Sequence, residues 1–194
     1  MPRYLLVHKP YNVLSNFVDP AGRATLADYV PALGVYAAGR LDYDSEGLLL
    51  LTDDGPLAHR LTNPRFEHPK TYLVQVELVS GAIPPGALEQ LRAGVVLRGE
   101  RVRPAEAEVT PDPGLPPRPV PVRGYHPAAW LRVVLREGKK RQLRRMTAAV
   151  GLPALRLVRT ALGPLRLGDL APGAWRDLTP AELKALRRAL GLTP

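Results

Sequence analysis

The sequence contains no cysteine and no long apolar run, and these absences exclude several classes of protein. Without thiols, the 194-residue chain cannot form disulfides, thiolate zinc sites or iron–sulfur clusters, and it cannot use a cysteine nucleophile. Apolar runs such as Leu48–Leu51 are far shorter than the roughly 20 residues that span a bilayer. The first residues also lack the apolar stretch of a signal peptide. We therefore expect a soluble, cytoplasmic protein.

Acidic residues are also scarce, since 18 Asp and Glu stand against 27 Lys and Arg, giving a net charge of +9. The excess is concentrated between residues 123 and 145, where Glu137 is the only acid among eight basic residues. Such a basic stretch is typical of a surface that binds nucleic-acid phosphates. Because 45% of the residues are hydrophobic, the chain can still bury a core.

The hydrophobic pattern predicts an α+β protein. Period-two alternation predicts a strand over residues 70–79, with Tyr72, Val74, Val76 and Leu78 on one face. Further strands are expected at 4–7, 103–110, 130–136, 154–160 and 165–167, and helices at 25–33, 56–61, 87–93, 140–150 and from 180 onward. The connections are too short for repeated parallel crossovers, so we expect a mixed, mainly antiparallel sheet flanked by helices. We expect one catalytic domain over 1–194, with any division into two lobes at the Pro-rich loop 111–121.

The segment 39–47, which reads GRLDYDSEG, has three interpretations. Asp42, Asp44 and Glu46 have the spacing of a calcium loop, but the ninth loop position is Leu50 and no helix is predicted to end before the segment. The second interpretation is a surface turn in which short polar side chains cap the backbone. The third is that Asp42 is an ionised nucleophile held by a nearby arginine such as Arg40.

Five segments together resemble the RsuA-type family of ribosomal pseudouridine synthases. They occur in the family's order along nearly the whole chain: HKPYNVL (8–14), GRLD with SEGLLLLTDDG (39–42 and 45–55), KTYLV (70–74), EGKKRQLRRM (137–146), and LVRT (157–160) followed by Gly163. The resemblance implies the pseudouridine synthase fold. Because the first motif starts at residue 8, we expect no N-terminal RNA-binding module.

The resemblance also implies the reaction. The N-glycosidic bond of a uridine breaks, the base turns while it is held, and its C5 bonds to the sugar, without a metal or cofactor. Segments 35–42 and 173–176 look most like the members that modify large-subunit (23S) rRNA, so we expect that RNA as the partner of a monomeric enzyme. A non-catalytic RNA-binding protein is the competing hypothesis, although it does not explain an acid within GRLD.

Roles for individual residues follow from the same resemblance. Asp42 is expected to be the nucleophile, attacking C6 of the base or C1′ of the sugar, and Tyr72 to stack on the flipped base. Arg144 is expected to pair with Asp42, and Arg141 is the alternative. Arg40 is expected to replace the flipped base, and Leu143 and Leu157 to form an apolar pocket wall. The residues expected to bind RNA are Lys9, Lys70, Lys139, Lys140, Arg141 and Arg145.

Overall fold

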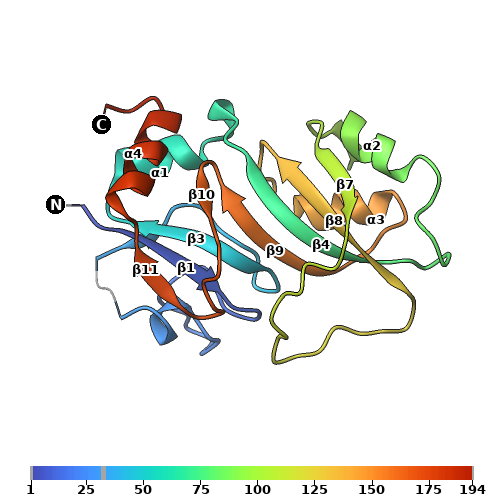
Figure 1. The fold of residues 1–194 in the computed structure, drawn as a ribbon, viewed down its shortest axis with the longest axis horizontal. Helices are drawn as coiled ribbons and strands as arrows, with labels where there is room; N and C mark the ends of the chain where they lie inside the picture. The colour runs from blue at the N-terminus through green and yellow to red at the C-terminus, as the bar shows by residue number, and fades with distance from the viewer. Residues whose placement is uncertain (1, 32–33, 194) are drawn as a thin grey trace. The chain divides into compact units, whose positions relative to one another are not determined.

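The structure is a computed structural model that describes residues 2–31 and 34–193. A mainly antiparallel sheet and α-helices make up the described ranges, which confirms the expected α+β class (Figure 1). The chain forms two compact units. The first comprises Met1–His68 and Arg159–Pro194, and the second comprises Pro69–Val158. None of the helices in the described ranges has the length and hydrophobicity that crossing a bilayer requires.

The first unit is built on antiparallel strands with a leucine-rich core. β1 (Tyr4–Lys9) lies between β3 (Glu46–Thr52) and β11 (Trp175–Asp177). β2 (Tyr36–Ala37) pairs with β3, and β10 (Leu165–Arg166) pairs with the end of β9 (Ala154–Leu162). Every residue of β3 is buried, so its four leucines form a continuous apolar run instead of an alternating one.

The helices of the first unit begin at side-chain N-caps that the sequence predicts. The Asp54 carboxylate accepts from the Leu57 amide at the start of α1 (Gly55–Thr62). The helix expected at 25–33 is shorter than predicted. It is the 3₁₀ helix η1 (Leu26–Asp28), because Pro31 cannot continue a helix; Leu33 lies outside the described residues. A second 3₁₀ turn, η2, spans Pro64–Phe66.

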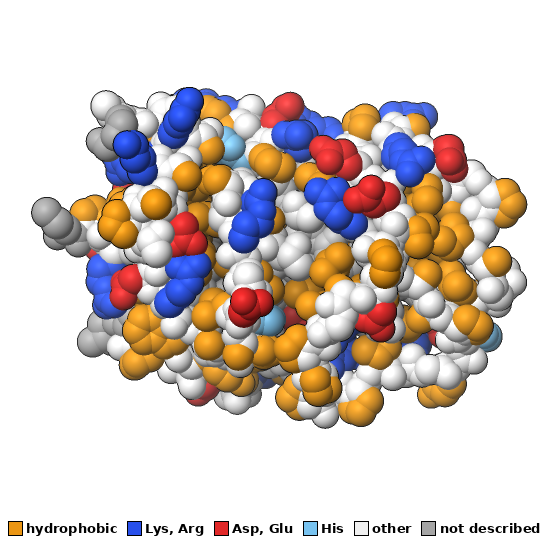
Figure 2. All heavy atoms as spheres, viewed as in Figure 1, with side chains coloured by type: hydrophobic (Ala, Val, Ile, Leu, Met, Phe, Trp, Pro, Cys, Tyr) orange, Lys and Arg blue, Asp and Glu red, His pale blue; other side chains and the backbone are white. Residues whose placement is uncertain are grey.

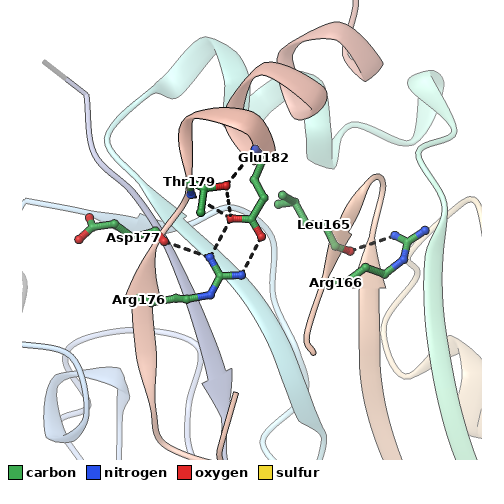
Figure 3. Close-up of polar contacts among 6 residues, drawn as sticks. All are labelled: Leu165, Arg166, Arg176, Asp177, Thr179 and Glu182. Atoms are coloured by element: carbon green, nitrogen blue, oxygen red, sulfur yellow. Dashed lines mark hydrogen bonds and ion pairs between the residues drawn. The ribbon is translucent and has the colours of Figure 1, made fainter. Parts of the chain in front are cut away.

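The last helix, α4 (Pro180–Ala189), has the expected capping box between Thr179 and Glu182. Figure 3 shows that Arg176, from β11, also reaches Glu182, and its guanidinium donates to the two carboxylate oxygens at 2.8 and 2.7 Å. The Arg176 hydrogen bond lowers the pKa of Glu182 to about 2. This pair joins the edge strand of the sheet to the start of the helix.

The second unit contains β4 (Lys70–Glu77), β8 (Ala128–Leu135) and β7 (Glu106–Thr110), with β8 in the middle and all pairings antiparallel. Its helices are α2 (Ala87–Ala93) and α3 (Gln142–Ala149), and β5 (Val96–Leu97) pairs with β6 (Glu100–Arg101). Tyr72, Val74 and Val76 are buried, as the alternation predicts, whereas Leu78 lies beyond the end of β4 and is half-buried. The strand expected from residue 103 begins at Glu106, because Pro104 has no N–H for the ladder.

The Pro-rich loop 111–121 contains no helix or strand, as predicted. It follows β7 and leads toward β8, and these two strands pair with each other, so both ends of the loop belong to one sheet. The loop therefore lies inside the second unit, and the units separate at His68–Pro69 and within β9 instead.

Candidate active site

The expected site residues occur in both units of the chain. Arg40 and Asp42 belong to the first unit, which also contains Lys9. The second unit contains Tyr72, Leu143, Arg144 and Leu157.

Asp42 lies on a tight turn immediately before β3. The Ser45 amide donates to the Asp42 carbonyl at 3.0 Å, which closes the turn. Asp42 is half-buried, whereas Ser45 and Glu46 are buried and Arg40 is exposed. The carboxylate of Asp42 thus stands on a short, defined backbone segment at the edge of the first unit's core.

The hydroxyl of Ser15 holds the residue before Asp42. Its Oγ donates to the Leu41 carbonyl at 2.8 Å and accepts from the Leu41 amide at 3.0 Å. One side chain therefore satisfies both backbone groups of a residue that belongs to no regular helix or strand.

The ammonium of Lys9 holds the residue after Asp42. Its Nζ donates to the carbonyls of Pro10 at 2.8 Å, Val13 at 2.7 Å and Tyr43 at 3.3 Å. Lys9 has an exposed fraction of 0%, and this burial argues against the expectation that its ammonium binds an RNA phosphate. The sequence shows Lys9 as one lysine of a basic protein. It does not show that the Lys9 ammonium lies among backbone carbonyl oxygens.

The surroundings of Lys9 have opposing effects on its pKa. Burial lowers the pKa of Lys9 to about 7, while the carboxylates of Glu46, Asp44 and Asp42 raise it. Arg159 also lowers this pKa, because two cations in one buried region repel each other. The acidic segment 39–47 therefore interacts with the buried Lys9 ammonium, which its sequence did not indicate.

Arg159 approaches the same segment from β9. It is buried, and its Nε donates to the Leu48 carbonyl at 2.8 Å. Residues 2–31 and 34–193 contain no group of three or more His, Cys, Asp or Glu placed to hold a metal ion. The calcium interpretation of the acidic segment therefore has no support within those ranges.

In the second unit, Tyr72 lies on β4 directly opposite Val133 of β8, and its exposed fraction is 8%. Leu143 of α3 and Leu157 of β9 are each 4% exposed. Arg144 is half-buried, and its guanidinium donates to the Ala154 carbonyl at 3.2 Å. Tyr72, Leu143 and Leu157 are therefore buried within the second unit, and Arg144 is half-buried.

Glu137 and Gln142 support the turn that leads into α3. The Glu137 carboxylate is buried and accepts from the Arg103 amide at 2.9 Å and from Gln142 Nε2 at 2.6 Å. Gln142 Oε1 in turn accepts from the Lys139 amide at 2.9 Å. The one acid in the basic stretch therefore has a structural role, which its isolation among basic residues did not reveal.

Much of the basic stretch is paired with acids from neighbouring strands. Figure 2 shows acidic side chains beside basic ones over β7 and β8. Ion pairs join Arg123 with Glu77, Arg132 with Glu108, Arg136 with Glu106, and Lys139 with Glu100. The antiparallel register places Glu108 opposite Arg132, so this pair depends on strand pairing and could not be predicted from the sequence alone.

The other residues expected to bind RNA have different exposures. Lys140 and Arg141 are exposed, and Arg141 has a left-handed backbone conformation at the N-terminus of α3. Arg145 is half-buried and donates to the Lys140 carbonyl, and Lys70 is half-buried at the start of β4. The start of α3 is thus the most accessible basic part of this set.

Comparisons with known proteins agree with the motifs and the fold. Residues 3–149 match the family model described as RNA pseudouridylate synthase. The chain is 49% identical over 179 residues to ribosomal large subunit pseudouridine synthase E of Vibrio vulnificus, covering 91% of this chain and 75% of the relative. The protein of the same name from Xanthomonas campestris pv. campestris is 55% identical over 177 residues, covering 89% of this chain and 93% of the relative.

A solved structure gives the same result for the fold. A crystal structure of a pseudouridylate synthase superposes with a TM-score of 0.80 at 29% sequence identity, covering 96% of this chain and 74% of the other. The expected pseudouridine synthase fold is confirmed by this match. Since the family model covers most of the chain and the relatives are about half identical to it, the chain belongs to the RNA pseudouridylate synthase family.

Proposed function

We propose that this enzyme converts a uridine of large-subunit (23S) rRNA to pseudouridine, with Asp42 as the nucleophile. The relatives in Vibrio and Xanthomonas are named for that activity on the large ribosomal subunit. The observation that supports the role of Asp42 is its position, half-buried on a turn whose flanking backbone is bonded to Lys9 and Ser15. A carboxylate held in this way is prepared for covalent attack on an electrophilic carbon.

The remaining expected residues complete the chemistry of the proposal. Tyr72 would stack on the extruded base, since an enzyme that acts on a base must take it out of the stack. Leu143 and Leu157 would keep water from the detached uracil, which must stay in place while its C5 turns toward the sugar. Arg144 would pair with Asp42, with Arg141 as the alternative. Arg40 would fill the gap left by the base.

RNA binding is assigned mainly to the start of α3. Lys140 and Arg141 are exposed there, and Arg145 lies one turn further along the helix. Lys139 and Lys70 would contribute less, because Lys139 is paired with Glu100 and Lys70 is half-buried. Phosphate contacts of this kind set affinity without selecting a sequence.

The test of this function is the variant Asp42→Asn in a strain that lacks the native gene. Pseudouridines in 23S rRNA are mapped in the strain carrying the wild-type protein, the variant or neither. We expect one modified site to require the wild-type protein and to be absent with Asp42→Asn, while purified variant and wild type bind the RNA equally. The matched control is Asp169→Asn, which changes an exposed aspartate outside the site. Modification by Asp42→Asn would rule out Asp42 as the nucleophile, and a complete pseudouridine map without the gene would rule out the activity.

We also propose that the enzyme acts as a monomer in the cytoplasm. A covalent mechanism that uses residues of one chain needs no second subunit. Size-exclusion chromatography with light scattering is expected to give a mass near 21.2 kDa at micromolar concentration. A mass of twice that value would contradict the monomer.

A further inference from the structure

The residues on both sides of Asp42 are bonded to one short segment that the proposed chemistry does not use. Leu41 is held through its amide and carbonyl by Ser15 Oγ, at 3.0 and 2.8 Å. Tyr43 is held through its carbonyl by Lys9 Nζ, at 3.3 Å. The segment 9–15 therefore contacts the backbone immediately before and immediately after the proposed nucleophile.

The donors and acceptors of Lys9 are matched in number. A lysine ammonium has three N–H donors, and here it has three carbonyl acceptors, on Pro10, Val13 and Tyr43. Burial of such a cation is costly unless its donors are satisfied, so the arrangement is stable only while those carbonyls stay in place. The ammonium thus links the chain that follows β1 to the turn that contains Asp42.

The turn belongs to no strand ladder, and the Ser45 amide donates to the Asp42 carbonyl within it. An attacking atom must lie within about 3–3.5 Å of its target, and a displacement of about 1 Å can cost on the order of 10²-fold in rate. The position of the Asp42 carboxylate is therefore sensitive to whatever holds Leu41 and Tyr43.

We infer that Lys9 and Ser15 are positioning residues that form a backbone clamp, through Leu41 and Tyr43, and set the place of the Asp42 carboxylate for attack. The inference rests on the proposed function, since it takes Asp42 as the nucleophile. Neither side chain contacts the RNA in this account. The clamp acts on the rate of the chemical step and leaves substrate affinity unchanged.

Single-turnover kinetics on the 23S rRNA substrate test the clamp. Ser15→Ala removes both bonds to Leu41, and Lys9→Met keeps the length of the side chain without its donors. We expect each variant to lower the rate of the chemical step by about 10- to 100-fold, with the RNA Kd changed by less than threefold. Ser15→Thr, which restores a hydroxyl, is expected to recover most of the rate. If Lys9→Met does not fold, as judged by circular dichroism, Ser15→Ala and Ser15→Thr still decide the question.

The controls change the same residue types where no clamp exists. Ser80→Ala removes an exposed hydroxyl that donates to the Ala82 carbonyl at 3.1 Å, and Lys184→Met neutralises an exposed lysine of α4. Both controls are expected to keep the wild-type rate. A rate within twofold of wild type for Ser15→Ala would overturn the clamp, and so would a loss confined to RNA affinity in Lys9→Met.

The pH dependence of the rate gives a readout that a purely structural role would not move. The groups that act on the Lys9 ammonium are the carboxylates of Glu46, Asp44 and Asp42 and the guanidinium of Arg159. Since burial lowers the pKa of Lys9 to about 7, the third donor is lost as pH rises through that value. We expect the wild-type rate to fall there and the rate of Lys9→Met to show no such step. The same step in Lys9→Met would overturn the assignment.

Failure of the clamp and failure of the proposed function are separable. Asp42→Asn is measured beside the clamp variants with the same RNA. An inactive Asp42→Asn with fully active Ser15→Ala would refute the clamp alone. An active Asp42→Asn would refute the nucleophile on which the clamp depends.

Discussion

The backbone of Arg159 passes so close to Gly47 that no side chain fits between them. A Cβ atom on Gly47 would lie 2.6 Å from the Arg159 amide nitrogen and nearer still to its carbonyl oxygen. Gly47 also has a φ of +108°, which L side chains rarely adopt. The contact brings β9 against the start of β3, five residues after Asp42, and so places Arg159 among the buried charges of the acidic segment.

Gly47→Ala is expected to destabilise the protein by about 3 kcal/mol or more, because positive φ costs on the order of 1–3 kcal/mol and the clash with backbone atoms adds to it. Urea denaturation measures the loss. The control is Gly22→Ala, where φ is +70° and nothing lies within 4 Å of the added Cβ, and where about 1 kcal/mol is expected from the backbone alone. Equal losses for the two variants would show that the Arg159 contact is not tight.

The Arg176–Glu182 pair predicts a specific acid dependence of stability. Glu182 has its pKa lowered to about 2, below the ordinary value of about 4.3 for an unfolded chain. The stabilisation is therefore fully present above about pH 5 and is lost as pH falls toward 2. Glu182→Gln keeps an amide oxygen for the capping box but removes the charge, and it is expected to cost about 0.5–1 kcal/mol, since the pair is partly exposed.

Urea denaturation from pH 7 to pH 2 checks this. The difference in unfolding free energy between wild type and Glu182→Gln should be constant above about pH 5 and shrink toward pH 2. A difference that stays constant throughout would mean that the charge pair contributes nothing.

Paired and exposed basic residues are expected to contribute differently to RNA binding. Lys140→Ala should weaken binding and make the slope of log K against log salt shallower by about 0.7, the value for one single-strand phosphate. Arg132→Ala should leave the slope nearly unchanged, because Arg132 is paired with Glu108 at 3.1 Å. Filter binding at several salt concentrations measures both. A larger effect of Arg132→Ala than of Lys140→Ala would mean that the cross-strand pairs open when RNA binds.

Tyr72 is expected to act through its ring. Stacking of a base on an aromatic side chain contributes about 1–3 kcal/mol, so Tyr72→Leu should lower the rate of modification by roughly 5- to 150-fold. Tyr72→Phe keeps the ring and tests the hydroxyl. A Phe variant as impaired as the Leu variant would show that the hydroxyl, not the ring, is what the reaction needs.

The motifs of this chain determined its family, and local patterns determined several elements. Alternation in 70–79 identified β4 and its buried face, and the Thr179–Glu182 box identified the start of α4. These two predictions are correct because each depends on residues that are close together in the sequence. Side-chain periodicity and capping hydrogen bonds need no distant partner. Proline also acts locally. The helix before Pro31 and the strand after Pro104 are both shorter than their apolar patterns indicated.

Tertiary structure decided what the charged residues do. Lys9 and Arg132 are both basic residues that the sequence does not distinguish by environment. In the structure, Lys9 is buried and donates to three backbone carbonyls, whereas Arg132 forms a cross-strand ion pair with Glu108. A charge interacts with whatever the fold brings within a few ångströms, and strand register and loop packing set those neighbours. The sequence alone therefore determined the fold, the family and the candidate nucleophile Asp42. Only the folded chain determined which side chains bond to the backbone on either side of Asp42 and which basic residues are exposed.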